Sequence, residues 1–424
     1  MNLIAELKTR GLVQDIMPGT EDQLNKEMTA AYVGFDPTAD SLHVGSLLPI
    51  TLLMRLQQAG HKPYALVGGA TGMVGDPSGK SQERNLLDMN TIQAYCAGIR
   101  KQLEKFLDFD PAKENAAEMV NNYDWLRDYT FLDFIRDVGK HITVNYMLSK
   151  DSVQKRLETG LSFTEFTYQL IQGYDFYYLN KEKNIKLQMG GADQWGNMVT
   201  GTELIRRKGG GEAYAFTCPL VTKTDGSKFG KSEGGNIWLD PARTSPYQFY
   251  QFWLKQDDAD AARMSLIYSF RPVEEIQALT EEHNAAPHLR KLQKALAEEL
   301  TILVHSSEDL ERVQRASEIL YGKAPVEAVR QLSEQELLEI MDGIPQVSGS
   351  RTALEEGLEL IGFLAEGKVF PSRGEARKMI QNGGFSINKE KVTAPDFTIR
   401  PEHLLNGKYL LLQKGKNYTL AVFS

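Results

Sequence analysis

Two lysines near the middle of the chain have the type and spacing of a phosphate clamp. Lys228 and Lys231 flank a Phe-Gly pair within the glycine-rich stretch from Lys223 to Ser232, which directly follows a predicted strand at 219–222. Ammonium groups on a movable loop can follow negative charge as it develops on a reacting phosphate. The stretch therefore predicts a contact with phosphates, although so short a motif is weak evidence when taken alone.

The polar turn from Asp36 to Ser46 is a second candidate. It contains His43 and Gly45, follows a predicted strand at 30–35 and precedes a predicted helix at 47–58. A helix N-terminus attracts anions, and glycine lets a ligand approach the backbone closely. Two interpretations stay open from these residues: either the turn serves a nucleotide, or His43 only caps the helix and Gly45 fills a tight packing position.

A polar face on an apolar helix predicts a small-molecule pocket. The segment from Leu161 to Leu179 is rich in aromatic residues but carries Tyr168, Gln172 and Asp175. Their separations place the three side chains on one helical face. Burying these polar groups is costly unless they are satisfied. We interpret the face as one wall of a ligand pocket, and a face exposed to solvent is the alternative.

A glycine-rich loop after the second predicted strand resembles a P-loop without matching it. The stretch from Gly72 to Ser81 has Val74 where the pattern requires glycine. The loop displays Asp76, Lys80 and Arg84. It is predicted to contact phosphates, with an ordinary surface loop as the alternative.

Polar residues follow two further predicted strands. Asp193 and Gln194 come after a glycine pair that ends the strand at 185–189, and Asn121 and Asn122 follow an apolar pair. Open α/β sheets bind ligands at the carboxyl ends of their strands. We therefore expect the first segment to recognise a ribose or a carboxylate, and the second to lie near a ligand.

Composition places the chain among soluble globular proteins. It has 424 residues, of which 42% are hydrophobic and 25% are charged, and its length fits two or three domains. No apolar run approaches the ~20 residues of a membrane span. The first residues lack a secretory apolar region. Two cysteines exclude a disulfide framework and a four-thiolate zinc site, so we expect a cytoplasmic location.

The end of the chain is basic although the whole is acidic. Residues 370–424 contain nine Lys or Arg against four Asp or Glu, while the net charge of the chain is −8. Arg373, Arg377 and Lys378 share one face of a predicted helix. This arrangement predicts a phosphate-binding surface for a polyanion, and a solvated surface is the alternative.

In this order, the motifs resemble those of the bacterial tyrosyl-tRNA synthetases, which are class I aminoacyl-tRNA synthetases. His43-Val-Gly-Ser46 looks like the family's His-Ile-Gly-His signature, and Lys228-Phe-Gly-Lys-Ser232 looks like its Lys-Met-Ser-Lys-Ser signature. Residues 370–424 resemble its S4-like RNA-binding module. The match covers essentially the whole chain. Ser46 departs from the family pattern, which puts in doubt one contact to the adenosine.

The resemblance implies a division of the chain into functional parts. It implies a Rossmann-like α/β catalytic domain at 1–222, the catalytic lysine loop at 223–235, a helical tRNA-binding domain at 236–346, and a small α+β S4-like RNA-binding domain at 352–424. The implied substrates are L-tyrosine, ATP with Mg²⁺ and tRNA(Tyr). A homodimer is implied by the resemblance only, and neither a membrane nor a metal site built from protein alone is expected.

The resemblance also assigns roles to residues. The substrate phenol would be bound by Tyr32 and Asp175. The α-ammonium would be held by Asp76, Tyr168 and Gln172. The reacting carboxylate would lie near Gln188 and Gln194. The nucleotide would contact Asp36, Gly45, Ser46, Gly191, Asp193, Lys228, Lys231 and Ser232. Phosphate charge in the transition state would be stabilised by Thr38, His43, Lys80, Arg84, Lys228 and Lys231. The tRNA would contact Arg373, Arg377 and Lys378.

Two other functions stay open at the level of sequence. A tryptophanyl-type synthetase would belong to the same subclass, but the pairing of Tyr32 with Asp175 and the S4-like tail argue against it. An RNA-binding protein on a degenerate synthetase scaffold would have no need of His43, Lys228 and Lys231.

Overall fold

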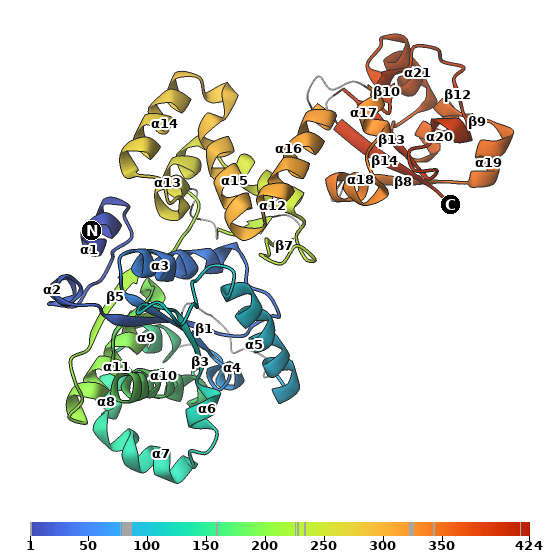
Figure 1. Ribbon diagram of the computed structural model, residues 1–424. Helices are drawn as coiled ribbons and strands as arrows, with labels where there is room; N and C mark the ends of the chain where they lie inside the picture. The colour runs from blue at the N-terminus through green and yellow to red at the C-terminus, as the bar shows by residue number, and fades with distance from the viewer. Residues whose placement is uncertain are drawn as a thin grey trace. The chain divides into compact units, whose positions relative to one another are not determined.

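The structure is a computed structural model that describes most of the chain. The described residues are 2–76, 78, 87–157, 160–224, 226, 229–232, 235–321, 326–341, 344–415 and 417–424. They form two compact units (Figure 1). The first comprises Met1–Thr244 and Phe252–Val304, and the second comprises Ser245–Gln251 and His305–Ser424.

A parallel sheet of five strands forms the centre of the first unit. Its order is β3-β2-β1-β4-β5, and every neighbouring pair is parallel. The strands are β1 (Ala30–Phe35), β2 (Lys62–Val67), β3 (Glu118–Asn121), β4 (Ile185–Gly191) and β5 (Tyr214–Cys218). The nearly continuous apolar runs of β1, β2 and β5 are typical of strands that are covered on both faces.

Helices cover both faces of this sheet (Figure 1). On one face lie α3 (Leu47–Gln58) and α5 (Met89–Leu103), and on the other lie α10 (Phe163–Lys183) and α11 (Trp195–Arg207). Ser162 and Glu165 form a capping box that starts α10. The arrangement is the doubly wound α/β fold, and it confirms the predicted Rossmann-like domain.

Most elements around the predicted site residues agree with expectation. The predicted strand at 30–35 and helix at 47–58 match β1 and α3. Pro49 lies in the first turn of α3, where its missing N–H costs nothing. The strand predicted at 219–222 is wrong, because the fifth strand is β5 and ends before Pro219, which has no N–H to donate to a sheet.

Short elements complete the sheet domain. Before β1 lie α1 (Leu3–Thr9) and α2 (Thr20–Lys26). Between β1 and β3 lie η1 (Val44–Ser46) and α4 (Thr71–Val74). Between β3 and α10 lie α6 (Tyr123–Leu126), α7 (Phe131–Asp137), η2 (Gly139–His141), α8 (Val144–Leu148) and α9 (Asp151–Leu157). After β4 lies η3 (Ala192–Gln194), and after β5 lie β6 (Lys231–Ser232) and β7 (Gly235–Asn236).

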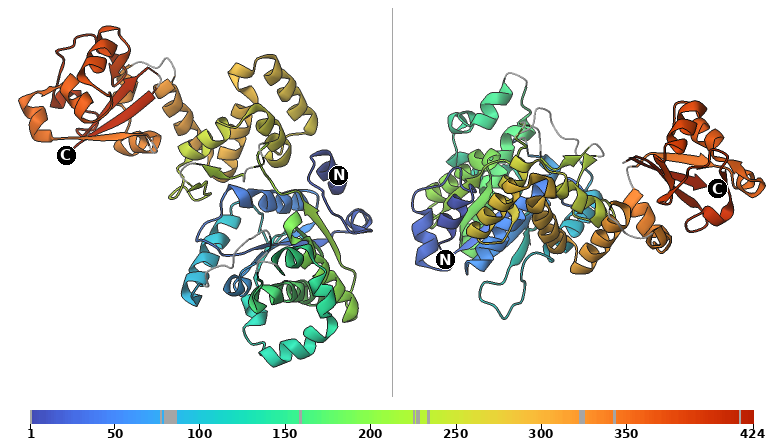
Figure 2. Two further views of the ribbon diagram at one scale, coloured as in Figure 1. Left: turned by 180° about the vertical axis from the view of Figure 1, so that it is seen from behind. Right: turned by 90° about the horizontal axis from the view of Figure 1, so that it is seen from above.

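Helices follow the sheet domain, as the sequence predicts. The first unit contains α13 (Asp258–Tyr268), α14 (Val273–Ala285), η4 (Pro287–Leu289) and α15 (Lys291–Val304). The left view of Figure 2 shows α13, α14 and α15 as one group, consistent with their mutual contacts. Helix α12 (Pro246–Leu254) continues across the boundary between the units.

Besides part of α12, the described residues of the second unit form three helices and a small mixed domain. The helices are α16 (Ser307–Tyr321), α17 (Val326–Arg330) and α18 (Glu334–Met341). The mixed domain has the sheet order β11-β10-β13-β14-β8. Its elements are β8 (Gln346–Gly349), α19 (Arg351–Glu356), β9 (Leu358–Glu359), α20 (Leu360–Glu366), α21 (Arg373–Gln381), β10 (Phe385–Ile387), β11 (Glu390–Lys391), β12 (Thr398–Ile399), η5 (Pro401–His403), β13 (Tyr409–Lys414) and β14 (Asn417–Phe423).

The core of the mixed domain explains its extent. Buried residues of α20 and α21 pack with Phe385, Leu410 and Phe423 of the sheet. The parallel pairing of β8 with β14 brings residues 346–349 into the same sheet. The predicted α+β domain at the end of the chain is thereby confirmed as a fold.

The helices after the parallel sheet divide between the two compact units. Residues 252–304 group with the parallel sheet, whereas 305–341 group with the mixed domain. Within the second unit, Glu334 of α18 accepts hydrogen bonds from Lys408 Nζ at 3.0 Å and Tyr409 Oη at 2.8 Å. Asn406 donates to the Leu332 carbonyl at 3.2 Å. These contacts attach α18 to the mixed domain.

Across the described residues, every helix is too short or too polar to cross a membrane.

Candidate active site

A cavity of about 330 Å³ lies at the carboxyl ends of β1 and β4, the neighbouring strands at which the strand order reverses. Ligands of doubly wound sheets bind at this position. The cavity is lined by fourteen residues that the sequence predicted for the site. These are Tyr32, Asp36, Thr38, His43, Gly45, Ser46, Asp76, Tyr168, Gln172, Asp175, Gln188, Gly191, Asp193 and Gln194.

Asp175 lies at the buried end of the cavity and is only 1% exposed. Its Oδ1 accepts a hydrogen bond from Trp125 Nε1 at 2.8 Å, and its Oδ2 accepts one from Asn122 Nδ2 at 2.9 Å. Burial raises the pKa of Asp175 to about 7, although both hydrogen bonds oppose the rise. The carboxyl group is thus held in one orientation by two donors.

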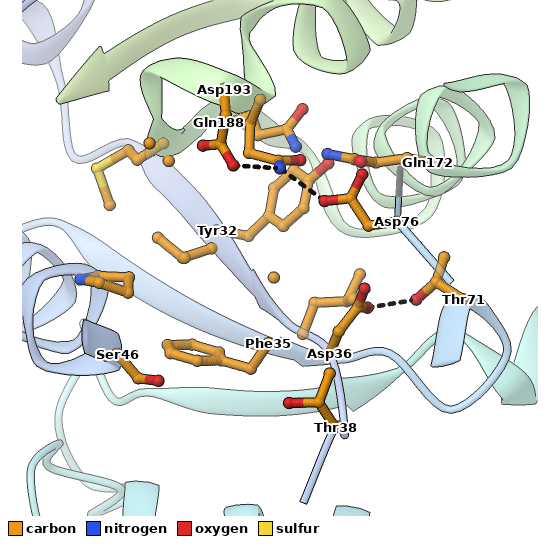
Figure 3. A pocket seen from close by; sticks show the side chains of 18 of the residues that line it. Tyr32, Phe35, Asp36, Thr38, Ser46, Thr71, Asp76, Gln172, Gln188 and Asp193 are labelled. Atoms are coloured by element: carbon orange, nitrogen blue, oxygen red, sulfur yellow. Dashed lines mark hydrogen bonds between the residues drawn. The ribbon is translucent and has the colours of Figure 1, made fainter. Parts of the chain in front are cut away.

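Tyr32 projects from β1 toward the same cavity (Figure 3). Burial raises the pKa of its phenol well above the ordinary value, and the charge of Asp175 raises it further. Among the described residues, the buried oxygens Tyr32 Oη and Gln188 Oε1 have no hydrogen-bond partner. Native proteins rarely leave such atoms unsatisfied. A ligand carrying a hydroxyl group would satisfy Tyr32 at this end of the cavity.

Asp36 connects two walls of the cavity. Its Oδ1 accepts a hydrogen bond from Thr71 Oγ1 at 2.9 Å (Figure 3). Its Oδ2 accepts one from Tyr168 Oη at 3.0 Å. Thr71 Oγ1 in turn accepts from Asn122 Nδ2 at 3.0 Å. A continuous chain of hydrogen bonds therefore runs from Tyr168 to Asp175. The sequence identified Asp36 and Tyr168 but not their pairing.

Acceptor groups gather around Asp76, whose side chain faces the same space as Gln172 and Asp193 (Figure 3). Gln194 Nε2 donates to Asp76 Oδ2 at 2.7 Å, and Asn197 Nδ2 donates to Gln172 Oε1 at 2.9 Å. Burial raises the pKa of Tyr168, with the charges of Asp36 and Asp76 as further causes. A carboxylate, an amide oxygen and a phenol oxygen together suit a cationic group such as an ammonium.

His43 both caps a helical turn and lines the cavity, so both interpretations of the turn have a structural basis. Its Nδ1 accepts a hydrogen bond from the Gly45 N–H at 2.9 Å at the start of η1. A neutral ring with Nδ1 as acceptor carries its proton on Nε2, which is then a donor. A Cβ on Gly45 would lie 2.6 Å from His43 Cε1, so the ring itself requires a glycine there.

The segment that follows the lysine loop lies beside His43. The Val44 N–H donates to the Ile237 carbonyl at 2.8 Å, and the rings of His43 and Trp238 meet edge to face at 6.0 Å. A Cβ on Gly230 would lie 3.3 Å from the Gly45 nitrogen. The two motifs, distant in sequence, therefore adjoin at one side of the cavity.

Some predicted residues cannot be placed as side chains. Lys80, Arg84 and Lys228 lie outside the described residues, and Lys231 and Ser232 are described only by their backbone in β6. Arg373, Arg377 and Lys378 are exposed on α21 in the second unit. Within the described residues, no cluster of three His, Cys, Asp or Glu side chains is placed to hold a metal ion.

Four residues that contact the site received no role in it from the sequence, although the segment with Asn122 was expected to lie near a ligand. They are Thr71, Asn122, Trp125 and Asn197. The polar segment at the end of β3 gave a signal for Asn122 and Trp125, but only the sheet order shows that they meet Asp175. Sequence reasoning gave no comparable signal for Thr71 or Asn197.

Comparison with known proteins identifies the family. Residues 24–322 match the family model described as "tRNA synthetases class I (W and Y)". The chain belongs to this family of class I tRNA synthetases. Residues 336–421 of this synthetase match a second family, described as "Tyrosine--tRNA ligase SYY-like C-terminal domain".

Individual relatives of this synthetase are similar over their full length. It is 59% identical to a tyrosine--tRNA ligase of Bacteroides thetaiotaomicron, over 100% of both chains. It is 58% identical to a tyrosine--tRNA ligase of Porphyromonas gingivalis, over 98% of both chains. A C-terminally truncated mitochondrial tyrosyl-tRNA synthetase of Aspergillus nidulans has a similar structure, with a TM-score of 0.65 and 30% identity, covering 74% of this chain and 92% of that one.

Proposed function

We propose that this synthetase joins L-tyrosine to tRNA(Tyr) in two steps. The tyrosine carboxylate attacks the α-phosphate of ATP in line and expels pyrophosphate, which leaves tyrosyl-adenylate. The tyrosyl group then passes to the ribose of the 3′-terminal adenosine of tRNA, and AMP leaves. We expect Mg²⁺ to arrive on the phosphates of ATP, and we expect the reaction in the cytoplasm.

The observation that carries this proposal is that Tyr32 and Asp175 line the same cavity, close enough for the Asp175 charge to raise the pKa of the Tyr32 phenol. The hydroxyl group of a substrate phenol would donate a hydrogen bond to the Asp175 carboxylate. Its oxygen would accept a hydrogen bond from the Tyr32 hydroxyl, which has no partner among the described residues. An indole presents no oxygen for this pair, which disfavours tryptophan. The full-length tyrosine--tRNA ligase relatives support the same choice.

The rest of the cavity suits the rest of the substrates. We assign Asp76, Tyr168 and Gln172 to the α-ammonium and Gln188 with Gln194 to the region of the reacting carboxylate. The nucleotide would lie over Asp36, Gly45, Ser46, Gly191 and Asp193. We expect charge on the departing phosphates to be stabilised by Thr38 and His43. Lys80 and Arg84 from the first glycine-rich segment, and Lys228 and Lys231 from the second, would contribute to the same stabilisation.

Charging of tRNA with radioactive tyrosine tests the proposal. We expect acid-precipitable label with bacterial tRNA and ATP, and none when ATP is omitted. A degenerate RNA-binding homologue would bind tRNA but leave it uncharged, which would contradict the proposal.

The affinity for tyrosine should depend on pH through Asp175. Burial raises the pKa of this carboxyl to about 7, and a phenol donor requires the ionised form. We expect the Kd for tyrosine to rise about tenfold for each pH unit below that pKa and to be constant above it. Isothermal titration at several pH values measures this, and a Kd that is constant across the range would contradict the assignment.

The same shift has a defined sign for stability. The folded protein holds the Asp175 proton more tightly than the unfolded chain does, because the pKa rises from 3.8 to about 7 on folding. The contribution of this group to the free energy of unfolding therefore falls as pH rises through that interval.

We expect the basic face of α21 to bind tRNA and to have no effect on the activation of tyrosine. We expect replacement of Arg373, Arg377 and Lys378 by alanine to raise the KM for tRNA about 10- to 100-fold at ~0.1 M salt. The salt slope, which is the slope of the logarithm of tRNA affinity against the logarithm of salt concentration, should fall in magnitude by about 2 to 3. Pyrophosphate exchange without tRNA serves as the control and should be unchanged. An unaltered salt slope would remove these residues from the RNA contact.

A homodimer would explain an exposed apolar surface on the first unit. Phe131, Leu132 and Ile135 of α7, Val144 of α8 and Phe163 of α10 are 64%, 76%, 47%, 60% and 65% exposed. Other residues of α7, α8 and α10 pack together in one hydrophobic core. The five exposed side chains point away from that core. Apolar patches of this kind mark interfaces between proteins.

The replacement Leu132→Glu should separate the dimer. A carboxylate in an apolar interface is desolvated without a partner, so we expect light scattering to give the mass of one chain. The replacement Arg127→Glu, at an exposed residue outside α7, is the comparison and should retain two chains. A wild-type protein with the mass of one chain would contradict the dimer.

A further inference from the structure

Helix α5 holds the segment before His43 through the side chain of Gln102. Gln102 Oε1 accepts a hydrogen bond from the Leu42 N–H at 2.8 Å, and Gln102 Nε2 donates to Ser41 Oγ at 2.9 Å. Ser41 Oγ donates to the Leu42 carbonyl at 2.8 Å. All three residues are buried. Buried polar groups of this kind are costly to leave unpaired, so the contact fixes the segment.

A glycine on the same helix brings its backbone against the segment. A Cβ on Gly98 would lie 2.1 Å from the carbonyl oxygen of Asp40 and 3.1 Å from its carbonyl carbon. No side chain fits this contact unless the segment moves. Gly98 and Gln102 are one turn apart, and they therefore define the position of residues 40–42 together.

Residues 237–239, which follow the lysine loop, also hold the segment. The Leu239 N–H donates to the Leu42 carbonyl at 2.9 Å, and the Val44 N–H donates to the Ile237 carbonyl at 2.8 Å. His43 lies between these two anchored residues. A displacement of Leu42 is consequently passed to the His43 ring.

We propose that Gln102 is a positioning residue for His43, acting from α5 without lining the cavity. This inference rests on the proposed function, because it concerns the phosphate contact made by His43. Misplacement of a reacting group by about 1 Å can cost about 10²-fold in rate, even when the change is remote from the chemistry. Gln102 would prevent such a misplacement by satisfying both Ser41 and Leu42.

Two variants with different physical effects test the proposal. Gln102→Leu removes both hydrogen bonds, and Gly98→Ala pushes the segment by steric contact. We expect each to lower the rate of tyrosyl-adenylate formation about 10- to 100-fold, with the KM for tyrosine changed by no more than about twofold. Gln93→Leu, at an exposed position of α5, is the matched control. Gln102→Glu retains an acceptor for Leu42 and should recover part of the rate.

A double-mutant cycle with His43→Ala separates positioning from general stability. If Gln102 acts through His43, then Gln102→Leu should have an effect of no more than about twofold in the His43→Ala background. An equal fold-loss in both backgrounds, or no loss in the wild-type background, would overturn the proposal. If Gln102→Leu does not fold, Gly98→Ala carries the same cycle. Wild-type protein without tyrosine-dependent exchange would instead refute the proposed function.

Discussion

Asp175→Asn should lower kcat/KM for tyrosine activation by about 10²-fold or more, which corresponds to about 3 kcal/mol. The replacement removes the negative charge that would accept the substrate phenol. It also cannot reproduce the existing hydrogen bonds. Both carboxylate oxygens accept from N–H donors, at Asn122 and Trp125, so the new amide nitrogen must face one donor whichever way it turns.

The measurement is pyrophosphate exchange at varied tyrosine and ATP concentrations. The loss should appear mainly as a raised KM for tyrosine, with the KM for ATP nearly unchanged, because the nucleotide is assigned to the other end of the cavity. Asp128→Asn, at an exposed aspartate, is the matched control. Circular dichroism would establish that the variant is folded. Normal activation by folded Asp175→Asn would contradict the phenol site.

His43→Ala should give the opposite kinetic pattern. Because His43 Nδ1 accepts a hydrogen bond from the Gly45 N–H, the proton of the neutral His43 ring lies on Nε2, which is therefore a donor. We propose that this N–H donates a hydrogen bond to a phosphate oxygen on which negative charge develops in the transition state. Removing one such donor costs about 3 kcal/mol, or about 10²-fold in kcat. The KM for tyrosine should change little.

Single-turnover formation of tyrosyl-adenylate measures this effect without product release. A raised KM for tyrosine with an unchanged rate would place His43 in amino-acid binding instead. The contrast between His43→Ala and Asp175→Asn is informative, because a general loss of folded protein would lower the apparent kcat and leave the KM for tyrosine unchanged in both variants.

The sequence predicted well the parts of the fold that depend on local pattern. The run from Ala30 to Phe35 predicted a buried strand, and the spacing of Tyr168, Gln172 and Asp175 predicted a polar helical face that the structure places at the cavity. Periodicity and strand-end chemistry are properties of neighbouring residues, so one sequence contains them. The strand placed at 219–222 failed because apolar residues on either side of Pro219 gave similar patterns.

Contacts between distant segments were not predictable in the same way. The pairings of Asp36 with Tyr168 and of Asp175 with Asn122 depend on the lateral order of the strands. Local patterns do not contain that order. The same reason explains why Gln102 was missed: it lies on a helix without a chemical motif, and only packing places it against Leu42.

Tyrosine-dependent exchange of pyrophosphate into ATP tests the central claim most directly. The assay would compare tyrosine, phenylalanine and tryptophan without tRNA. Exchange with tyrosine alone is predicted, because only its hydroxyl satisfies both Tyr32 and Asp175. Exchange driven by tryptophan, or exchange with phenylalanine as fast as with tyrosine, would contradict the assignment of Tyr32 and Asp175 as the pair that binds the phenol.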